Sequence, residues 1–142
     1  MKKTLLIIAA LLLAMCLYTA CADTAQDITD KCHVTATNMS NPYKLLDGKV
    51  YTYWTAGSGG STINITIPEG VTAGGLLVDF YFSNVTYTLE QKDIDGNVIA
   101  VNTSDEVFRS LSRYFTISPL AAKLSLRVSG GGQVTIVRVY GE

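Results

Sequence analysis

Few side chains in this 142-residue sequence could do acid–base or nucleophilic chemistry, and their spacing does not bring them together. His33 is the only histidine, and no G-x-S-x-G motif supplies a nucleophile to pair with it. A zinc site needs more His and Cys residues than the chain has. Glu90, Asp105 and Glu106 are candidate acid–base carboxylates, but the sequence sets no separation between them of the kind that glycosidic hydrolysis requires. We therefore expect no enzyme active site, and we expect His33 to be a surface or half-buried strand residue.

The acidic stretch "DIDGN", residues 93–97, could suggest a calcium loop. An EF-hand loop needs Gly at its sixth position and Glu at its twelfth. Counted from Asp93, those positions hold Val98 and Ser104, so the pattern fails. A tight turn at Asp95-Gly96 explains the stretch without a metal, because Gly tolerates positive φ.

The stretch "LLDGKVYTYWTAGSGG", residues 45–60, concentrates ring side chains beside an Asp-Gly pair and a Gly/Ser run. It could be a binding loop, a metal loop, or a turn with a large core residue behind it. In an extended chain, Tyr51 and Tyr53 point one way and Thr52 the other. Flexible Gly/Ser next to exposed rings suits binding, although such runs are also ordinary connectors.

The elements that must position these residues begin after an N-terminal export signal. "MKK" is a basic n-region, an uncharged apolar run follows, and "ACA" precedes Asp23 as a small-x-small cleavage site. We interpret residues 1–22 as a bacterial-style signal peptide and expect a secreted or cell-surface protein. The stretch "YTAC" also resembles a lipoprotein cleavage box, although Tyr18 stands where an aliphatic residue is usual. Lipidation of Cys21 is therefore the alternative, and only that route would hold the chain on a membrane.

Cleavage after residue 22 leaves 120 of the 142 residues, which suits one domain. Cys32 is then the only thiol, so no internal disulfide can form and a hydrophobic core must stabilise the fold. We expect Cys32 to be a small apolar residue at the start of the first strand. Nine scattered basic residues against twelve acidic ones exclude nucleic-acid binding as a main role. The sequence thus predicts a lead-in at 23–31 and one domain at 32–142.

Hydrophobic periodicity after the lead-in is two, not 3.6, in runs rich in β-branched and aromatic residues. Strands are expected at "INITI", "LLVDFYF", "VTYTLEQ", "NVIAV", "YFTI", "LSLRV" and "VTIVRVY". Their short spacing predicts an all-β sandwich or barrel. We expect hairpins at Asp95-Gly96 and at "SGGGQ", residues 129–133, and at most one helical turn within residues 104–113.

Asp47, Gly48, Thr52, Trp54 and the Gly run after them, with the closing "VTIVRVYGE", resemble discoidin-like domains. These domains are also called F5/8 type C or galactose-binding-like, and the likeness runs from about residue 33 to the end. In detail it is similar to copies appended to secreted bacterial carbohydrate-processing enzymes. The resemblance implies an eight-stranded jelly-roll β-sandwich without catalysis.

The resemblance also implies a structural calcium ion in many relatives, held by the Asp and Thr of the Asp-Gly loop. Asp47 and Thr52 match those positions, but Ile136 stands where a Glu of the closing strand usually completes the site. Calcium prefers charged oxygen ligands, so this departure argues against the ion, and we expect no cofactor.

Binding of sugars or cell-wall polysaccharide through loops at one end is the function that the resemblance implies. Sugar rings present C–H faces that pack on aromatic rings, and polar side chains fix the hydroxyls. Candidate binding residues are therefore Tyr43, Tyr51, Tyr53, Trp54, Tyr81, Asn84 and Tyr114. Among them we expect Trp54 to be a core anchor instead. The alternative function is an envelope protein-interaction or adhesion module that binds no sugar.

Overall fold

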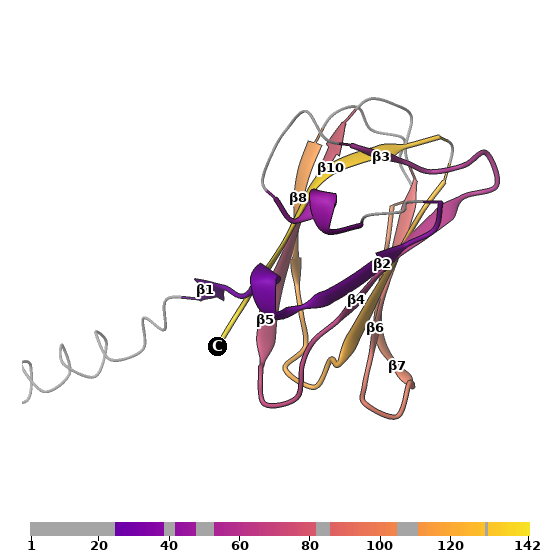
Figure 1. Ribbon diagram of the computed structural model, residues 1–142. Helices are drawn as coiled ribbons and strands as arrows, with labels where there is room; N and C mark the ends of the chain where they lie inside the picture. Colours follow the sequence, from indigo (N-terminus) through magenta and orange to yellow (C-terminus); the bar gives the residue numbers. More distant parts are fainter. Residues whose placement is uncertain (1–24, 39–41, 48–52, 82–85, 105–110, 130) are drawn as a thin grey trace, which may run out of the picture.

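Two antiparallel β-sheets packed face to face form the protein in this computed structural model, which describes residues 25–38, 42–47, 53–81, 86–104, 111–129 and 131–142 (Figure 1). Sheet A has the order β1-β10-β5-β8, and β3 also pairs with β10. Sheet B has the order β2-β4-β9-β6-β7. The strands of sheet A are β1 (Gln26–Asp27), β3 (Trp54–Thr55), β5 (Ala73–Tyr81), β8 (Leu111–Thr116) and β10 (Gln133–Gly141). Those of sheet B are β2 (His33–Ala36), β4 (Ser61–Thr66), β6 (Tyr87–Lys92), β7 (Val98–Thr103) and β9 (Lys123–Val128).

The predicted all-β sandwich is confirmed, but the described residues form ten strands and not eight. The two additional strands, β1 and β3, have two residues each, and both pair with β10. Such short pairings leave no alternating pattern in the sequence, because period two cannot be read from two residues. Two short 3-10 helices, η1 (Thr29–Lys31) and η2 (Pro42–Leu45), complete the elements. No helix in the described part of the chain is long and apolar enough to cross a membrane.

The core lies between the inner faces of the two sheets, and every second side chain of β4, β6 and β9 is buried there. β5 contributes Leu76, Val78 and Phe80, and β9 contributes Leu124 and Leu126 from the opposite sheet. The buried residues form one continuous cluster. Each fully buried aliphatic side chain contributes about 1.5–3 kcal/mol to folding, so this cluster is the main source of stability in the described domain, whose one cysteine, Cys32, is free.

Two expectations for single residues hold. Cys32 is buried just before β2, and burial, with the negative charges of Asp30 and Asp27, raises the pKa of its thiol to about 11. It is therefore protonated and unreactive at neutral pH. His33 is an exposed residue at the start of β2, which confirms its assignment to a strand at the surface.

The hairpin predicted at Asp95-Gly96 connects β6 and β7, which pair antiparallel. Gly96 has φ +88°, and Asn97 donates to the Asp93 carboxylate through its main-chain N at 2.8 Å and its side-chain Nδ2 at 3.0 Å. The hydrogen bond from the Asn97 side chain is the main reason that the pKa of Asp93 is lowered. These contacts are the turn itself, so the acidic residues need no metal to explain them.

The hairpin predicted at residues 129–133 is wrong. β9 belongs to sheet B and pairs with β4 and β6, whereas β10 belongs to sheet A and pairs with β5. The segment between them is a connection from one sheet to the other. The sequence signal was correct for a reversal of the chain, because Gly131 has φ +70°, but a reversal does not determine which strands pair.

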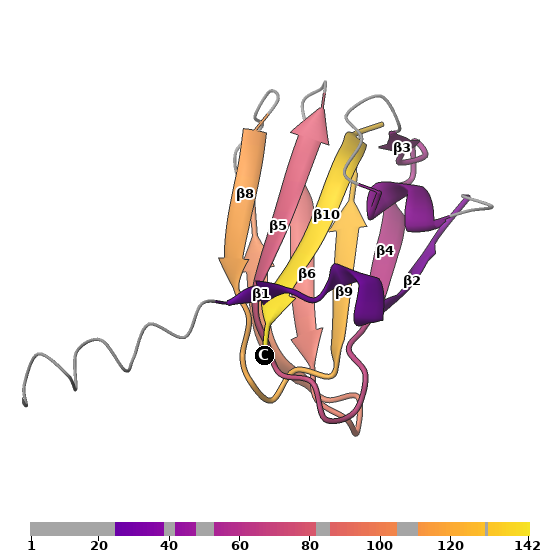
Figure 2. The same cartoon turned by 60° about the vertical axis from the view of Figure 1, so that its left-hand side comes forward.

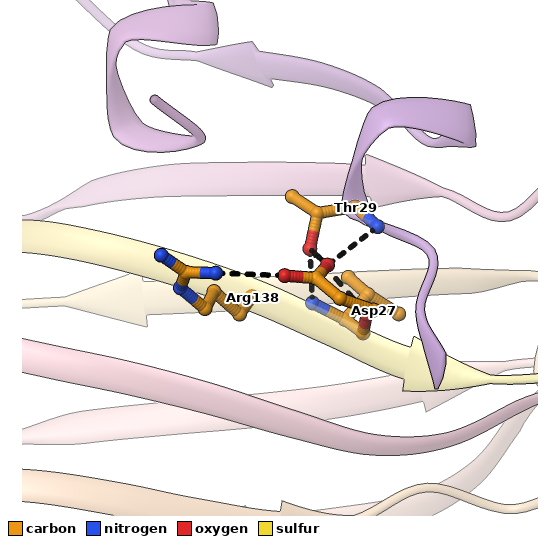
Figure 3. Close-up of polar contacts among 4 residues, drawn as sticks. Asp27, Thr29 and Arg138 are labelled. Carbon is orange, nitrogen blue, oxygen red and sulfur yellow. Dashed lines mark hydrogen bonds and ion pairs between the residues drawn. The ribbon is translucent and has the colours of Figure 1, made fainter. Parts of the chain in front are cut away.

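The segment expected to be a lead-in packs onto the sandwich through a small polar cluster (Figure 3). β1 pairs with the end of β10, where Gln26 lies opposite Gly141. The Asp27 carboxylate accepts hydrogen bonds from the Thr29 side chain, from the Thr29 main-chain N at 3.0 Å and from Arg138 Nη1 at 2.8 Å. Val139 N in turn donates to the buried Thr29 hydroxyl at 2.8 Å.

This cluster predicts a pH dependence of stability. Burial alone would raise the pKa of Asp27, but the hydrogen bonds from Thr29 and Arg138 outweigh it and hold the pKa below the ordinary value of 3.8. The lowered pKa means that stabilisation is full above 3.8 and is lost as the pH falls through the folded-state value. Asp27→Asn should therefore lower the melting temperature at pH 7, and the two proteins should converge near about pH 2. The partial exposure of the pair limits the effect to about 1 kcal/mol.

Thermal melts of both proteins between about pH 2 and pH 7 measure this difference. Glu69→Gln, at an exposed turn residue, is the matched control and should leave the pH profile unchanged. A constant difference between Asp27→Asn and the unaltered protein at every pH would contradict the assignment.

Candidate functional site

The end of the sandwich where β5 and β9 finish and β6, β8 and β10 begin is called the loop end (top of Figures 1 and 2). The described residues there include Tyr53, Thr86, Ser104 and Ser129. The opposite end carries the β6–β7 hairpin, the connections from β4 to β5 and from β8 to β9, and the C-terminus (Figure 1). The sequence predicted binding at the loop end.

Trp54 is a core residue, as expected, and its burial removes it from the candidate binding residues. Its side chain is only 3% exposed, and its Nε1 donates to the Thr37 main-chain oxygen at 2.8 Å. β3 holds it in place, because Trp54 lies opposite Val134 of β10. A buried indole with a satisfied N–H is a typical anchor. Trp54 therefore fastens the segment before β4 to both the core and the end of β2.

Tyr53 and Tyr114 are exposed, but the structure does not bring them together. Tyr53 is 53% exposed and directly precedes β3, so alternation turns it away from the core that holds Trp54. Tyr114 is 59% exposed in the middle of β8. β3 and β8 flank the β10–β5 pair on opposite sides, so the two rings lie near opposite edges of sheet A.

The remaining predicted residues are only partly covered by the description. Tyr43 belongs to η2 and Tyr81 ends β5, but their side chains lie outside the described part, as do all atoms of Tyr51, Thr52 and Asn84. Asp47 is described and exposed. Their roles in binding stay predictions.

The expectation that Asp47 and Thr52 hold no calcium ion stays a prediction, because one of the two residues is not described. Ile136 is buried on β10 and offers no oxygen, and Thr52 lies outside the described residues. No group of three or more His, Cys, Asp or Glu side chains that could hold a metal occurs in the part of the chain that the structure describes. We derive no function from this ion.

A polar pocket at the loop end was not predicted from the sequence. It has a volume of about 460 Å³ and lies on the outer side of sheet B. Its lining residues are Thr86, Tyr87, Thr88, Thr103, Ser104, Arg127 and Ser129. Three of them form one row across the sheet, because Thr88 lies opposite both Thr103 on β7 and Arg127 on β9. In the sequence Thr88, Thr103 and Arg127 are ordinary outward-facing strand positions, and only the pairing of the strands brings them together.

Arg127 is the one cation among the residues that line this pocket. Its Nη2 donates to the Gly59 main-chain oxygen at 3.1 Å, which fixes the guanidinium beside the segment that follows β3. Thr86 and Ser129 are hydrogen-bonded to each other at the rim. Hydroxyls can both donate and accept, and a guanidinium has five donors in a fixed plane. The pocket can therefore bind a ligand rich in hydroxyl groups, and no carboxylate belongs to its described lining residues.

Comparison with known proteins supports the fold. No protein-family model matches the chain, and no curated protein matches it. Solved structures do match: the family 32 carbohydrate-binding module of Clostridium perfringens NanJ in complex with galactose is 14% identical, with a TM-score of 0.62, over 82% of this chain and 98% of that one. The lectin-binding domain of lectinolysin, as a histidine mutant complexed with Lewis b, is 9% identical with a TM-score of 0.64, over 82% and 96% of the two chains.

A third match is to part of a larger protein. The family 89 glycoside hydrolase of Clostridium perfringens is 22% identical with a TM-score of 0.61, over 82% of this chain but only 14% of that one. At such low identities the matches establish the fold alone, which is the β-sandwich expected from the sequence. These neighbours include carbohydrate-binding modules with bound sugars and a segment of a glycoside hydrolase.

Proposed function

We propose that this protein binds carbohydrate without altering it chemically, and that the loop end is the binding surface. The observation that carries the proposal is the hydroxyl-lined pocket with Arg127 at that end of a galactose-binding-like sandwich. The structural neighbours with bound galactose and Lewis b support carbohydrate as the ligand class.

The proposed ligand is a glycan or cell-wall polysaccharide outside the cell. The signal-peptide features of residues 1–22 support this setting. Lipidation of Cys21 would instead keep the binding domain at the membrane, and the intact mass of the exported chain distinguishes the two routes. The affinity should be modest, because one shallow site buries little surface.

Substitution of Arg127 tests the proposed site. Arg127→Ala removes a charged donor from the pocket, and a hydrogen bond to a charged group contributes about 1.5–3 kcal/mol. We therefore expect at least about tenfold weaker glycan binding, measured by isothermal titration with ligands first found on a glycan array. Arg127→Lys keeps the charge but loses the planar fork, and it should restore binding only in part.

The matched control is Lys123→Ala, at the other end of β9 on the same outer face, and it should change the affinity less than about twofold. Melting temperatures of all variants show whether loss of the Gly59 contact has disturbed the fold. A folded protein that binds no glycan on the array, and no soluble polysaccharide, would overturn the proposal.

A further inference from the structure

The outer face of sheet A carries two tyrosines on the strands that flank β5 (seen from this side in Figure 2). Tyr114 comes from β8 and Tyr140 from β10, and their ring centroids are 6.3 Å apart with the planes tilted by 43°. Tyr114 is 59% exposed, although it lies in the middle of a regular strand. These rings are distant in sequence. They meet because β8 and β10 lie on either side of the same strand, β5.

Gly75 explains how the rings lie. It is opposite Tyr140 on one side and Thr116 on the other, yet it is buried although it belongs to the outer face. A Cβ atom at this position would be 1.9 Å from the Tyr114 hydroxyl oxygen and 2.4 Å from Cζ. The Tyr114 ring therefore reaches over the backbone of β5, with its hydroxyl end directly above Gly75.

A glycine inside a strand is destabilising by roughly 0.5–1 kcal/mol relative to alanine. At Gly75 it allows an aromatic ring to lie along the sheet instead of standing up from it. If the only role of the Tyr114 ring were to cover the backbone of β5, the most stable arrangement would bury most of the ring surface. Tyr114 instead keeps more than half of its surface in water. The arrangement thus leaves a large part of the Tyr114 side chain open to solvent above β5.

Polar groups flank the rings, and the charges named among them sum to a single negative charge. Arg138, Leu77 and Tyr114 form one row across β10, β5 and β8. Arg138 is paired with Asp27 at 2.8 Å, so these two charges cancel. On the other side of Tyr114, the Ser112 hydroxyl donates to the Asp79 carboxylate, which keeps its negative charge. The rings are therefore bordered by donors and acceptors, and the charge on Asp79 disfavours an anionic ligand.

We propose that this surface, the tyrosine platform formed by Tyr114 and Tyr140 over Gly75, binds an uncharged polysaccharide chain. Sugar rings stack their C–H faces on the exposed ring of Tyr114, and the flanking polar groups bind hydroxyls. A protein partner would need a contiguous contact of about 1,000 Å² or more, whereas the neighbours of the rings on this face are mostly polar. The choice of carbohydrate as ligand class rests on the proposed function, but the surface is a different one.

The platform and the loop-end pocket belong to different sheets, because Tyr114 is on sheet A and Arg127 on sheet B. The pocket lies on the outer side of sheet B and the platform on the outer side of sheet A, so the two surfaces face opposite sides of the sandwich and bind separately. A polymer offers several consecutive sugar rings to the platform, whereas a monosaccharide offers only one. Loss of the platform should therefore weaken binding of polysaccharides and leave binding of a single sugar at the loop end unchanged.

The test measures binding of the mature chain to soluble neutral galactan and mixed-linkage glucan, with polygalacturonate as a charged comparison, and to galactose. Tyr114→Ala removes the exposed ring, and truncation of a tyrosine at the centre of a binding surface should weaken neutral polysaccharide binding about tenfold. Gly75→Ala keeps both rings but places a Cβ where the Tyr114 ring lies, and it should have a similar effect. Tyr114→Phe retains the ring and should bind within about twofold of the unaltered chain.

Val101→Ala is the matched control, because Val101 is another exposed strand residue, 54% exposed on β7. Unchanged polysaccharide binding by a folded Tyr114→Ala, with loss on Arg127→Ala, would overturn the platform and leave the loop-end proposal intact. Loss on Tyr114→Ala alone would support the platform and contradict the loop end. A change in oligomeric state on Tyr114→Ala, without a change in sugar binding, would show a self-association surface and overturn the inference.

Discussion

Replacement of Trp54 with alanine is expected to lower the free energy of unfolding by about 3–5 kcal/mol. The side chain is almost completely buried, so its removal leaves a cavity between β3 and the core. The Thr37 main-chain oxygen also loses the Nε1 donor that now lies at 2.8 Å. Urea denaturation of residues 23–142 measures the change. Far-UV circular dichroism monitors the unfolding, because it does not depend on the fluorescence of the residue that is replaced.

The neighbouring residue supplies the control for this prediction. Tyr53→Ala, one residue earlier but exposed, should change the free energy of unfolding by about 0.5 kcal/mol or less. Trp54→Phe keeps most of the buried ring and removes the N–H, so its cost should fall between the two, near about 1–3 kcal/mol. Equal effects at positions 53 and 54 would show that the segment before β4 is not fastened through the indole.

Gln91→Leu is expected to destabilise the protein by about 2–4 kcal/mol, although leucine has a similar size and is more apolar. Gln91 is 2% exposed on β6, and its amide bridges the two sheets. Its Nε2 donates to the Thr116 main-chain oxygen at 3.0 Å, and its Oε1 accepts from the Ser118 main-chain N at 2.8 Å. Leucine would leave both main-chain groups without these partners, which costs more than the apolar burial gains.

Denaturant unfolding of Gln91→Leu beside Glu90→Gln distinguishes this bridge from a general sensitivity of β6. Glu90 is partly exposed, and its ion pair with Lys92 at 3.0 Å lies on the outer face. Loss of that pair should cost about 0–1 kcal/mol. If Gln91→Leu were neutral or stabilising, the bridge from β6 to the end of β8 would contribute nothing to joining the sheets.

Local patterns in the sequence were sufficient to predict where the strands lie, but not which strands pair with each other. Alternating runs such as "LSLRV" predicted β9 almost to its ends, because burial of every second residue follows directly from the pleat. The prediction of a hairpin between β9 and β10 was wrong. A Gly-rich segment has the same sequence features whether the next strand pairs with β9 or crosses to the other sheet. Strand pairing depends on contacts distant in sequence, and those are not visible in a local window.

The same distinction decides which site residues could be predicted. Trp54 could be assigned to the core, because in the motif that the sequence resembles this tryptophan usually anchors its loop. Arg127 could not be selected, because an arginine in an alternating strand is usual and becomes notable only beside Thr88 and Thr103. Tyr140 was missed for this reason too, since its partner Tyr114 reaches it across β5.

The pairing of β1 with the end of β10 also determines how the domain is presented to its surroundings. Gln26 and Gly141 are neighbours in the sheet, so the chain enters and leaves the sandwich at one pole, far from the loop end (Figure 1). An attachment through either end, whether a lipid, a wall linkage or a fused domain, would hold the sandwich by the pole where β1 pairs with β10. The loop end would then point away from the attachment, and the tyrosine platform would lie on the side of the domain.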